Sequence, residues 1–520
     1  MNTRNAYTIR ARQNRRTRPA SAPVGLALAT RATAIAHTSE PVAANPVCES
    51  LPGRACRHVL TDVQANTRLA QCEQTVKGLF DTIEPTLRRV AAMAYSADYA
   101  SQVQNLVNAE LGFAVPDKLL SDAWVKGPDM RALYASCAFS AIKASAARFV
   151  EDLNNQQETI QDSRNFFLDC GFHAVDVSPC ADGRLKGLSR YILRLPLSSF
   201  TRRKAYAGAL FDVETDVRHW SETELRRYRE GVPSTPDAGT RYLKVAVYHT
   251  SSSDPGHQGC AAHGSNERQA IDAALERLEQ FRQAIENAFC CGASTDILLI
   301  GVDTDTDAIR VHVPDAKGGL SAHRYVSNAE LYRYSLSLDS DAARLAVYDA
   351  IQGASDMQGW GAGEGPPHEG MRRLIANLLI NNLSQIEYVS DLYGGRYPDI
   401  GHAERYISVG DGFEEVQMRN VAYYAHLHTL EEGVADMDVG IKIFNGLNVS
   451  RGLPVPVAIH YRYDARVPGA RERAVQKALR VRDAIEARYA DLKQQGFLYC
   501  HLSVQDRPTG SAIETVEDGL

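Results

Sequence analysis

The 520-residue sequence contains no long hydrophobic run, no dense framework of cysteines and no excess of positive charge. Apolar stretches such as Ile297 to Val302 have the length of a strand, whereas a helix that spans a bilayer needs about 18 apolar residues. We therefore expect no membrane-spanning segment. The ten cysteines are too widely spread for a small disulfide-rich scaffold, which favours reduced thiols and a cytosolic protein. With a net charge of −6, the whole chain is not expected to bind nucleic acid.

The N-terminal segment has a composition of its own. Residues 1–50 contain seven arginines and two glutamates, so they carry a net charge of +5 in an otherwise acidic chain. Residues 1–48 show neither a helical nor a strand period, and we expect a disordered basic arm that binds an acidic partner. A twin-arginine signal at Arg15-Arg16 is the alternative, but Arg31 interrupts its apolar stretch early.

The remaining sequence is long enough for roughly three domains. Residues 49–157 repeat apolar side chains at the i, i+3, i+4, i+7 spacing of amphipathic helices, as in Val76 to Leu87 and Met130 to Leu153. This pattern predicts a helical domain for packing or docking. Residues 158–402 and 403–520 alternate strand patterns with helix patterns, which predicts two α/β domains.

The first α/β domain has four predicted strands and one long helix. The strands cover Phe172 to Val177, Tyr191 to Leu195, Arg241 to His249 and Asp296 to Asp303, and the helix begins at Asn266. Apolar residues at helical spacing give this helix one face that must be covered by the sheet.

The C-terminal part repeats this order of elements. Val455 to Tyr461 (V-P-V-A-I-H-Y) parallels Leu243 to His249 (L-K-V-A-V-Y-H). A helix over Ala470 to Gln495 and a strand over Phe497 to Val504 follow. We therefore expect an internal duplication.

A shared Asp-Gly pair extends this match upstream, between residues 177–184 and residues 407–413. The alignment pairs Cys180 with Val409, Arg184 with Phe413 and His249 with Tyr461. Because each of these replacements removes a polar or metal-binding group, we expect the second copy to be degenerate and without metal.

Chemistry concentrates in the first copy. Cys180, His249 and Cys260 offer two thiolates and one imidazole, a ligand set that suits tetrahedral Zn²⁺ with a fourth position left open. Cys180 and His249 stand at predicted strand ends, where ligands gather in open α/β sheets. Taken alone, Cys180 would be read as a buried free thiol. Together the three residues predict a catalytic zinc site.

Asp182 and Arg184 follow the first cysteine at two and four residues. A turn after the strand can aim Asp182 at the open metal position while Arg184 holds its carboxylate through a bidentate contact. The arginine also lowers the pKa of the aspartate, which keeps the carboxylate able to accept a proton.

These residues carry a resemblance to a known family. C-A-D-G-R (180–184) resembles the Cys-x-Asp-x-Arg motif of β-class carbonic anhydrases. The longer stretches F-F-L-D-C-G-F-H-A-V-D-V-S-P-C-A-D-G-R-L-K-G-L, D-I-L-L-I-G-V-D-T-D-T-D-A-I-R-V-H and D-I-G-H-A-E-R-Y-I-S-V-G-D-G-F resemble the carboxysomal shell carbonic anhydrases. That family, once called the ε class, is a divergent β subclass. The resemblance runs from about residue 50 to the C-terminus and is weak in residues 1–45.

The resemblance implies a helical N-terminal domain, a zinc-bearing catalytic domain and a C-terminal domain that repeats the catalytic fold. It implies one Zn²⁺ per chain on Cys180, His249 and Cys260, with Asp182 and Arg184 as a catalytic pair. The reaction is the interconversion of CO₂ and bicarbonate. The two halves of the chain would imitate the paired units of a β-class dimer.

Two histidines need separate consideration. His257-x-x-Cys260 fits the His-x-x-Cys spacing of ordinary β-class enzymes, but the carboxysomal family uses a histidine eleven residues before the cysteine, which here is His249. We expect His249 to be the ligand and His257 to lie in a mobile loop over Ser251 to Gly259. His402 begins the second copy; it could face the zinc and relay protons, or be a structural histidine.

The resemblance also implies a place in the cell and a set of partners. We expect the protein on the inner side of the carboxysome shell, where it supplies CO₂ to Rubisco. The basic arm is expected to bind Rubisco, shell proteins are further expected partners, and the chain is expected to form a homodimer or a larger homo-oligomer. The alternative is a structural linker between Rubisco and the shell that carries a non-catalytic zinc.

One weaker motif does not support a metal site. Asp303-Thr-Asp-Thr-Asp307 begins like a calcium-binding EF-hand loop. However, Ala308 stands where that loop needs glycine, and Pro314 stands where it needs glutamate. We therefore expect no calcium there.

Overall fold

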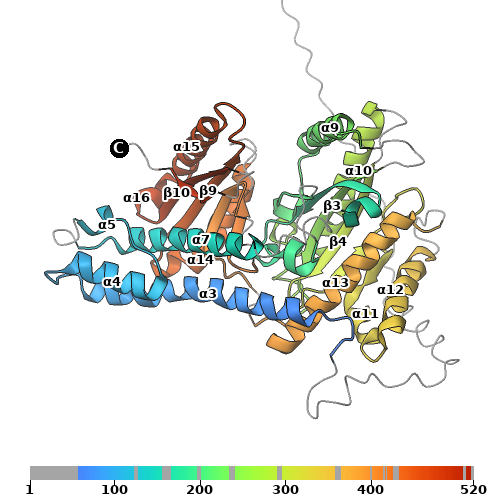
Figure 1. The fold of residues 1–520 in the computed structure, drawn as a ribbon, viewed down its shortest axis with the longest axis horizontal. Helices are drawn as coiled ribbons and strands as arrows, with labels where there is room; N and C mark the ends of the chain where they lie inside the picture. The colour runs from blue at the N-terminus through green and yellow to red at the C-terminus, as the bar shows by residue number, and fades with distance from the viewer. Residues whose placement is uncertain are drawn as a thin grey trace, which may run out of the picture. The chain divides into compact units, whose positions relative to one another are not determined.

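The fold contains two sheets, each covered by helices on both faces (Figure 1). The computed structural model describes residues 57–121, 127–154, 165–195, 201–232, 240–289, 295–357, 365–398, 401–413, 416, 418–425, 433–506 and 511–516. All of them belong to one unit, residues 45–520. The predicted arm over residues 1–48 lies outside the described residues.

The first sheet has six strands and carries the predicted zinc ligands. Its spatial order is β2 (Thr201–Arg203), β1 (Phe172–Pro179), β3 (Arg241–Thr250), β4 (Thr295–Asp303), β5 (Ile309–His312) and β6 (Tyr325–Ser327). Strands β2, β1, β3 and β4 are parallel, while β5 and β6 are antiparallel additions at one edge. Three of the four predicted strands are thereby confirmed with small changes of boundary.

Helices cover both faces of this sheet, as Figure 1 shows. One face packs against α9 (Val213–Arg229) and α10 (Glu267–Phe289), and the other packs against α13 (Glu369–Tyr393) together with α11 (Asn328–Ser335) and α12 (Ser340–Ser355). Because both faces are buried, β1, β3 and β4 are almost continuously buried along their lengths. The predicted helix at Asn266 is α10, and the Asn266 side chain caps it by accepting from the backbone N–H of Gln269.

The predicted strand over Tyr191 to Leu195 is wrong. After β1 the chain forms two short helical turns, η2 (Gly183–Leu185) and η3 (Leu188–Ile192). The alternation of Tyr191, Leu193 and Leu195 resembled a strand. Leu188, Ile192 and Leu193 are instead buried in the core that includes α13, and tertiary packing decides the local structure.

The second sheet repeats the order and directions of the first. It runs β8 (Ala422–Ala425), β7 (Tyr406–Gly410), β9 (Val455–Tyr463), β10 (Leu498–Asp506) and β11 (Glu514–Thr515). Strands β8, β7, β9 and β10 are parallel and β11 is antiparallel, as in the first sheet. Helices α14 (Gly433–Leu447) and α15 (Ala470–Arg488) pack on one face, and α16 (Ala490–Gln494) follows them. The prediction of a second α/β domain is confirmed.

Strand register corrects the pairing of residues between the two copies. Pro179 lies beside Val247 in the first sheet, and Gly410 lies beside His460 in the second. The backbone N–H of the next residue, Cys180 or Asp411, donates to the carbonyl of Val247 or His460 respectively. Cys180 therefore corresponds to Asp411 rather than Val409, and His249 corresponds to Arg462 rather than Tyr461.

A loop contact supports the corrected register. Asp303, at the end of β4, accepts a hydrogen bond from the backbone N–H of Ser252 at 3.0 Å. Asp506, at the end of β10, accepts one from the backbone N–H of Ala465 at 3.1 Å. These four residues occupy matching places relative to the strands. The second copy thus has an aspartate and an arginine where the first has a cysteine and a histidine.

The helical N-terminal region covers the free face of the second sheet. It consists of α3 (Val63–Ala92), α4 (Tyr99–Leu111), α5 (Lys118–Ser121) and α7 (Met130–Asn154), seen in blue and teal in Figure 1. The predicted stripe in α3, from Val76 to Leu87, is buried against α4, α7 and residues of β7. At its other side α3 contacts α13, where the hydroxyl of Tyr388 donates to Glu73. The predicted helical domain is confirmed.

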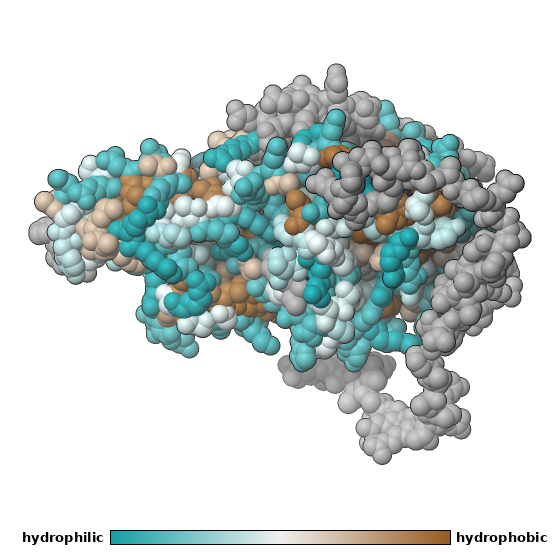
Figure 2. Space-filling view, turned by 90° about the horizontal axis from the view of Figure 1, so that it is seen from below, coloured by the Kyte–Doolittle hydropathy of each residue, from teal (hydrophilic) through white to brown (hydrophobic). Residues whose placement is uncertain are grey.

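The surface that Figure 2 shows is mostly hydrophilic, with hydrophobic residues in small separate groups. The large exposed apolar side chains are scattered: Tyr95 lies in the turn between α3 and α4, and Tyr228 lies in α9. In the part of the chain that the structure describes, no helix combines the length and apolar character needed to cross a membrane.

Candidate active site

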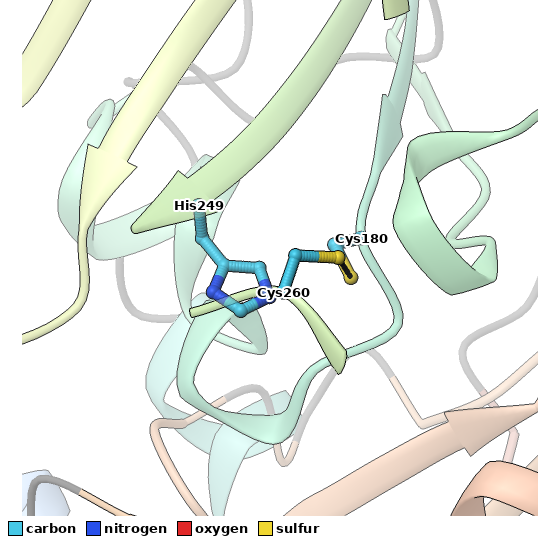
Figure 3. Close-up of side chains that lie close together, drawn as sticks. All are labelled: Cys180, His249 and Cys260. Atoms are coloured by element: carbon cyan, nitrogen blue, oxygen red, sulfur yellow. Dashed lines mark hydrogen bonds between the residues drawn. The ribbon is translucent and has the colours of Figure 1, made fainter. Parts of the chain in front are cut away.

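Three side chains from separate segments meet at the carboxyl ends of the parallel strands (Figure 3). Cys180 follows the last residue of β1, His249 lies one residue before the end of β3, and Cys260 precedes the short turn η5 (Ala261–His263). All three are buried, and their donor atoms lie within 4.8 Å of one another. The carboxyl ends of parallel strands meet at one edge of a sheet, which explains why residues distant in sequence converge here.

The geometry of the three groups fits a tetrahedral metal ion. The sulfurs of Cys180 and Cys260 are 3.8 Å apart, and two metal–sulfur bonds of about 2.3 Å at a tetrahedral angle span about 3.8 Å. Neither nitrogen of the buried His249 imidazole has a hydrogen-bond partner within the described residues. A buried polar group without a partner is costly, and metal coordination would satisfy it.

The two thiols influence each other's proton affinity. The hydrogen bond to Cys260, together with burial, raises the pKa of the Cys180 thiol well above its usual value. The same hydrogen bond lowers the pKa of Cys260. The two thiols therefore differ in proton affinity, and a divalent cation that favours both thiolates would compete with their protons.

Asp182 and Arg184 form the bidentate pair that the sequence predicted. The guanidinium donates from Nε to Oδ1 at 2.9 Å and from Nη2 to Oδ2 at 2.7 Å, and the backbone N–H of Arg184 also donates to Oδ1. Burial acts to raise the pKa of Asp182, but the charge of Arg184 holds it well below its ordinary value. The carboxylate is therefore an anion over the physiological pH range, and its Oδ2 lies 3.5 Å from Nε2 of His249.

His402 joins the site from the segment just before β7. A nitrogen of its ring and one carboxylate oxygen from each of Asp182 and Glu404 lie within 4.8 Å of one another. Its Nδ1 is 2.9 Å from Oε1 of Glu404. Sequence reasoning singled out His402 but missed Glu404; the available signal was a glutamate two residues after that histidine.

Two other histidines close in sequence to Cys260 lie elsewhere. The side chain of His257 is 84% exposed and pairs with Asp254. His263 lies with Nε2 3.2 Å from the carbonyl oxygen of Gly208. The structure thus brings His249, and not His257, beside the two cysteines.

The loop between His249 and Cys260 is fastened by the acidic segment that resembled an EF-hand. Oδ2 of Asp305 accepts from the hydroxyl of Ser251 at 2.9 Å and from the backbone N–H of Ser253 at 2.7 Å. Asp307 accepts from the hydroxyl of Tyr397 at 2.8 Å. Asp305 therefore fastens the loop through Oδ2, whereas Oδ2 of Asp307 is bound by Tyr397 outside the loop; Oδ1 of each carboxylate has no partner among the described residues.

Comparisons with known proteins match nearly the whole described chain. Three family models match it: Carboxysome Shell Carbonic Anhydrase, N-terminal, over residues 58–150; the catalytic domain over residues 162–402; and the C-terminal part over residues 403–520.

Curated relatives agree with these matches. A carboxysome shell carbonic anhydrase from Halothiobacillus neapolitanus is 57% identical over 474 residues, which is 91% of this chain and 92% of the relative. Proteins of the same name from Prochlorococcus marinus and Hydrogenovibrio crunogenus are 50% and 43% identical, over 89% and 86% of this chain and 89% and 84% of their own lengths. The chain therefore belongs to the carboxysome shell carbonic anhydrase family.

Proposed function

We propose that this chain is a zinc-dependent carbonic anhydrase of the carboxysome that interconverts CO₂ and bicarbonate. Family membership supports the activity and the location. The single observation that carries the proposal is a metal-sized cluster of two cysteines and a histidine directly beside an intact Asp–Arg pair. A metal ion held only for structure has no use for such a pair.

Cys180, His249 and Cys260 would hold the ion. Two soft thiolates and an imidazole suit Zn²⁺, and three protein ligands leave one position for substrate. When bound, zinc would supply the Lewis acidity that makes water a nucleophile near neutral pH. We propose one zinc per chain, because Arg462 corresponds to His249 in the second copy and a guanidinium has no lone pair to offer a metal ion.

The chain's own residues orient the reactants and move the proton. Asp182 accepts a hydrogen bond from the attacking oxygen and directs its lone pair at CO₂. Arg184 fixes both oxygens of that carboxylate, and its buried charge keeps Asp182 from taking the proton permanently. His402, with 27% of its side chain exposed, receives the proton and returns it to solvent.

Inside the carboxysome we propose that the enzyme supplies CO₂ to Rubisco from the inner side of the shell. The basic arm over residues 1–48 would bind Rubisco through contacts between arginines and carboxylates. We keep the predicted division into an arm, a helical domain over 49–157, a catalytic domain over 158–402 and a degenerate copy over 403–520. We also propose a homodimer or larger homo-oligomer, with shell proteins as further partners.

The alternative is a linker protein with a structural zinc, and one experiment separates the two. Zinc content and CO₂ hydration, followed by stopped flow, are measured for the native chain, Cys260→Ser and Cys137→Ser. Cys137 is a buried free thiol of α7, far from the site, and serves as the matched control. We expect the native chain and Cys137→Ser to bind zinc and hydrate CO₂, and Cys260→Ser to lose both. A zinc-loaded native chain without hydration activity would favour the linker.

A further inference from the structure

We propose that Glu404 is a positioning residue that holds the His402 imidazole by Nδ1, so that Nε2 is the nitrogen that exchanges protons with the active site. This inference rests on the proposed function and deepens it. It assigns a role to a buried carboxylate that reaches the catalytic domain from the segment before β7.

The contact between the two side chains fixes the tautomer of the histidine. The carboxylate of Glu404 is buried, and its Oε1 lies 2.9 Å from Nδ1 of His402. A carboxylate only accepts hydrogen bonds, so Nδ1 must carry a hydrogen. In the neutral ring Nε2 then has the free lone pair and is the base.

A glycine in the catalytic motif makes room for this carboxylate. A Cβ atom on Gly183 would lie 2.5 Å from Cγ and 2.8 Å from Cδ of Glu404, closer than real atoms approach. The side chain of Glu404 is buried and cannot swing into solvent. Gly183, between Asp182 and Arg184, thus gives Glu404 a slot against the catalytic loop.

A third residue fastens the two segments together. The backbone N–H of Asn420 donates to the carbonyl of Gly183 at 2.9 Å, and its side-chain amide donates to the carbonyl of Gly401 at 3.2 Å. Asn420 therefore ties the catalytic loop to the segment that carries His402 and Glu404. The contact between His402 and Glu404 is therefore held in place by the hydrogen bonds that join these two segments.

The charges around His402 favour a proton rather than a second metal ion. Asp182, His402 and Glu404 have the composition of a metal site, but the guanidinium of Arg184 is paired with Asp182 in the same cluster. Arg184 already balances the charge of Asp182, and a proton on His402 would face Glu404, so the group has no need of a divalent cation. Burial acts to lower the pKa of His402, whereas the hydrogen bond to Glu404 and the charge of Asp182 raise it above its usual value.

The proton transfer balances without any other reactant. Hydration of CO₂ yields bicarbonate and one proton, which Nε2 of His402 accepts. The resulting imidazolium carries hydrogen on both nitrogens, and its Nδ1–H group faces the Glu404 carboxylate. Loss of the proton from Nε2 to buffer restores the starting state.

Exchange of oxygen-18 between CO₂ and water at equilibrium tests this role in the zinc-loaded enzyme. The method reports separately the rate of CO₂–bicarbonate interconversion and the rate at which labelled water leaves, a step that needs a proton. We expect Glu404→Gln to lower the ratio of water release to interconversion about tenfold, the scale of a lost orienting group. Glu387→Gln, which alters another buried glutamate in α13 away from the site, should leave the ratio unchanged.

A second readout does not depend on activity. Histidine ¹⁵N NMR, with His402 assigned through His402→Ala, should show the ring protonated on Nδ1 in the native protein and a mixture of tautomers in Glu404→Gln. An unchanged ratio or an unchanged tautomer in a zinc-loaded Glu404→Gln enzyme overturns the inference and leaves the proposed function intact. A native enzyme without interconversion overturns the proposed function instead.

Combining substitutions at Gly183 and Glu404 tests whether the two residues act through the same contact. Gly183→Ala should lower the same ratio because it displaces Glu404, whereas adding Gly183→Ala to Glu404→Ala should cost little more. If the two substitutions lower the ratio by independent, multiplying factors, Glu404 does not act through this slot, and the inference fails.

Discussion

Replacing Asp182 with asparagine separates catalysis from metal binding. Among the described residues the carboxylate accepts three hydrogen bonds, all from Arg184, and both residues are buried. Asparagine keeps one acceptor oxygen but turns an NH₂ group toward a guanidinium N–H, so at least one charge-assisted hydrogen bond is lost and two donors face each other.

The expected magnitudes follow from this contact. A hydrogen bond to a charged group contributes about 1.5–3 kcal/mol, and a buried charge left without its partner costs about 3–5 kcal/mol. Glu404 lies close enough for its charge to influence Arg184 and offsets part of that cost. We expect Asp182→Asn to lower the free energy of unfolding by about 3 kcal/mol and CO₂ hydration by on the order of 10²-fold or more.

Zinc content, urea unfolding and stopped-flow hydration are measured on the same preparations. Asp296→Asn is the matched control, because Asp296 is equally buried and pairs with Arg241 and His368 away from the cluster. The control should lose stability but little activity, and both variants should keep one zinc. Near-normal hydration by Asp182→Asn, or loss of its zinc, would refute the assigned role.

Three further predictions concern stability and the arm. Lys244→Met removes one of the two cations that pair with Asp176 and Asp216, and Arg202 remains beside both carboxylates. The substitution should therefore cost about 3 kcal/mol in urea unfolding at pH 7, the lower end of the range for a broken buried ion pair. Burial acts to raise the pKa of Asp176, but the charge of Lys244 holds that pKa below its ordinary value. The stabilisation by this ion pair is therefore complete above about pH 4 and is lost at lower pH. The cost of Lys244→Met should shrink as the pH falls below about 4. Burial lowers the pKa of His312 to about 4, so below about pH 6.5 the unfolded chain binds a proton on this residue more strongly than the native chain does. Because of this residue, the free energy of unfolding should be about 2 kcal/mol lower at pH 5 than at neutral pH. In His312→Gln the free energy of unfolding should decrease less over the same pH range. Removing residues 1–48 should leave hydration intact but release the enzyme from Rubisco, and binding of the isolated arm should weaken steeply between about 50 and 200 mM salt; unchanged binding by the truncated enzyme would contradict the arm's role.

Much of the candidate site could be predicted because its residues mark strand ends. Cys180 and His249 each follow or close a run of buried apolar residues, and parallel strands bring such ends together. The stripe of α10 likewise predicted which face packs on the sheet. These features depend on local periodicity, which a single sequence contains.

The wrong or missed predictions concern contacts between residues distant in sequence, which the local periodicity does not report. Tyr191 to Leu195 has a strand-like alternation, yet it is buried as a helical turn against a distant helix. The pairing of the two copies failed by one or two residues because only strand register fixes which residues correspond. Glu404 was missed because its value depends on a slot at Gly183, more than two hundred residues earlier.

Zinc titration of CO₂ hydration tests the central claim most directly. Metal-free chain is given increasing zinc, and bound metal and hydration rate are measured together. The rate should rise in proportion to bound zinc and saturate at one ion per chain. Saturation at two ions, or a rate that does not depend on bound zinc, would contradict a single catalytic centre at Cys180, His249 and Cys260.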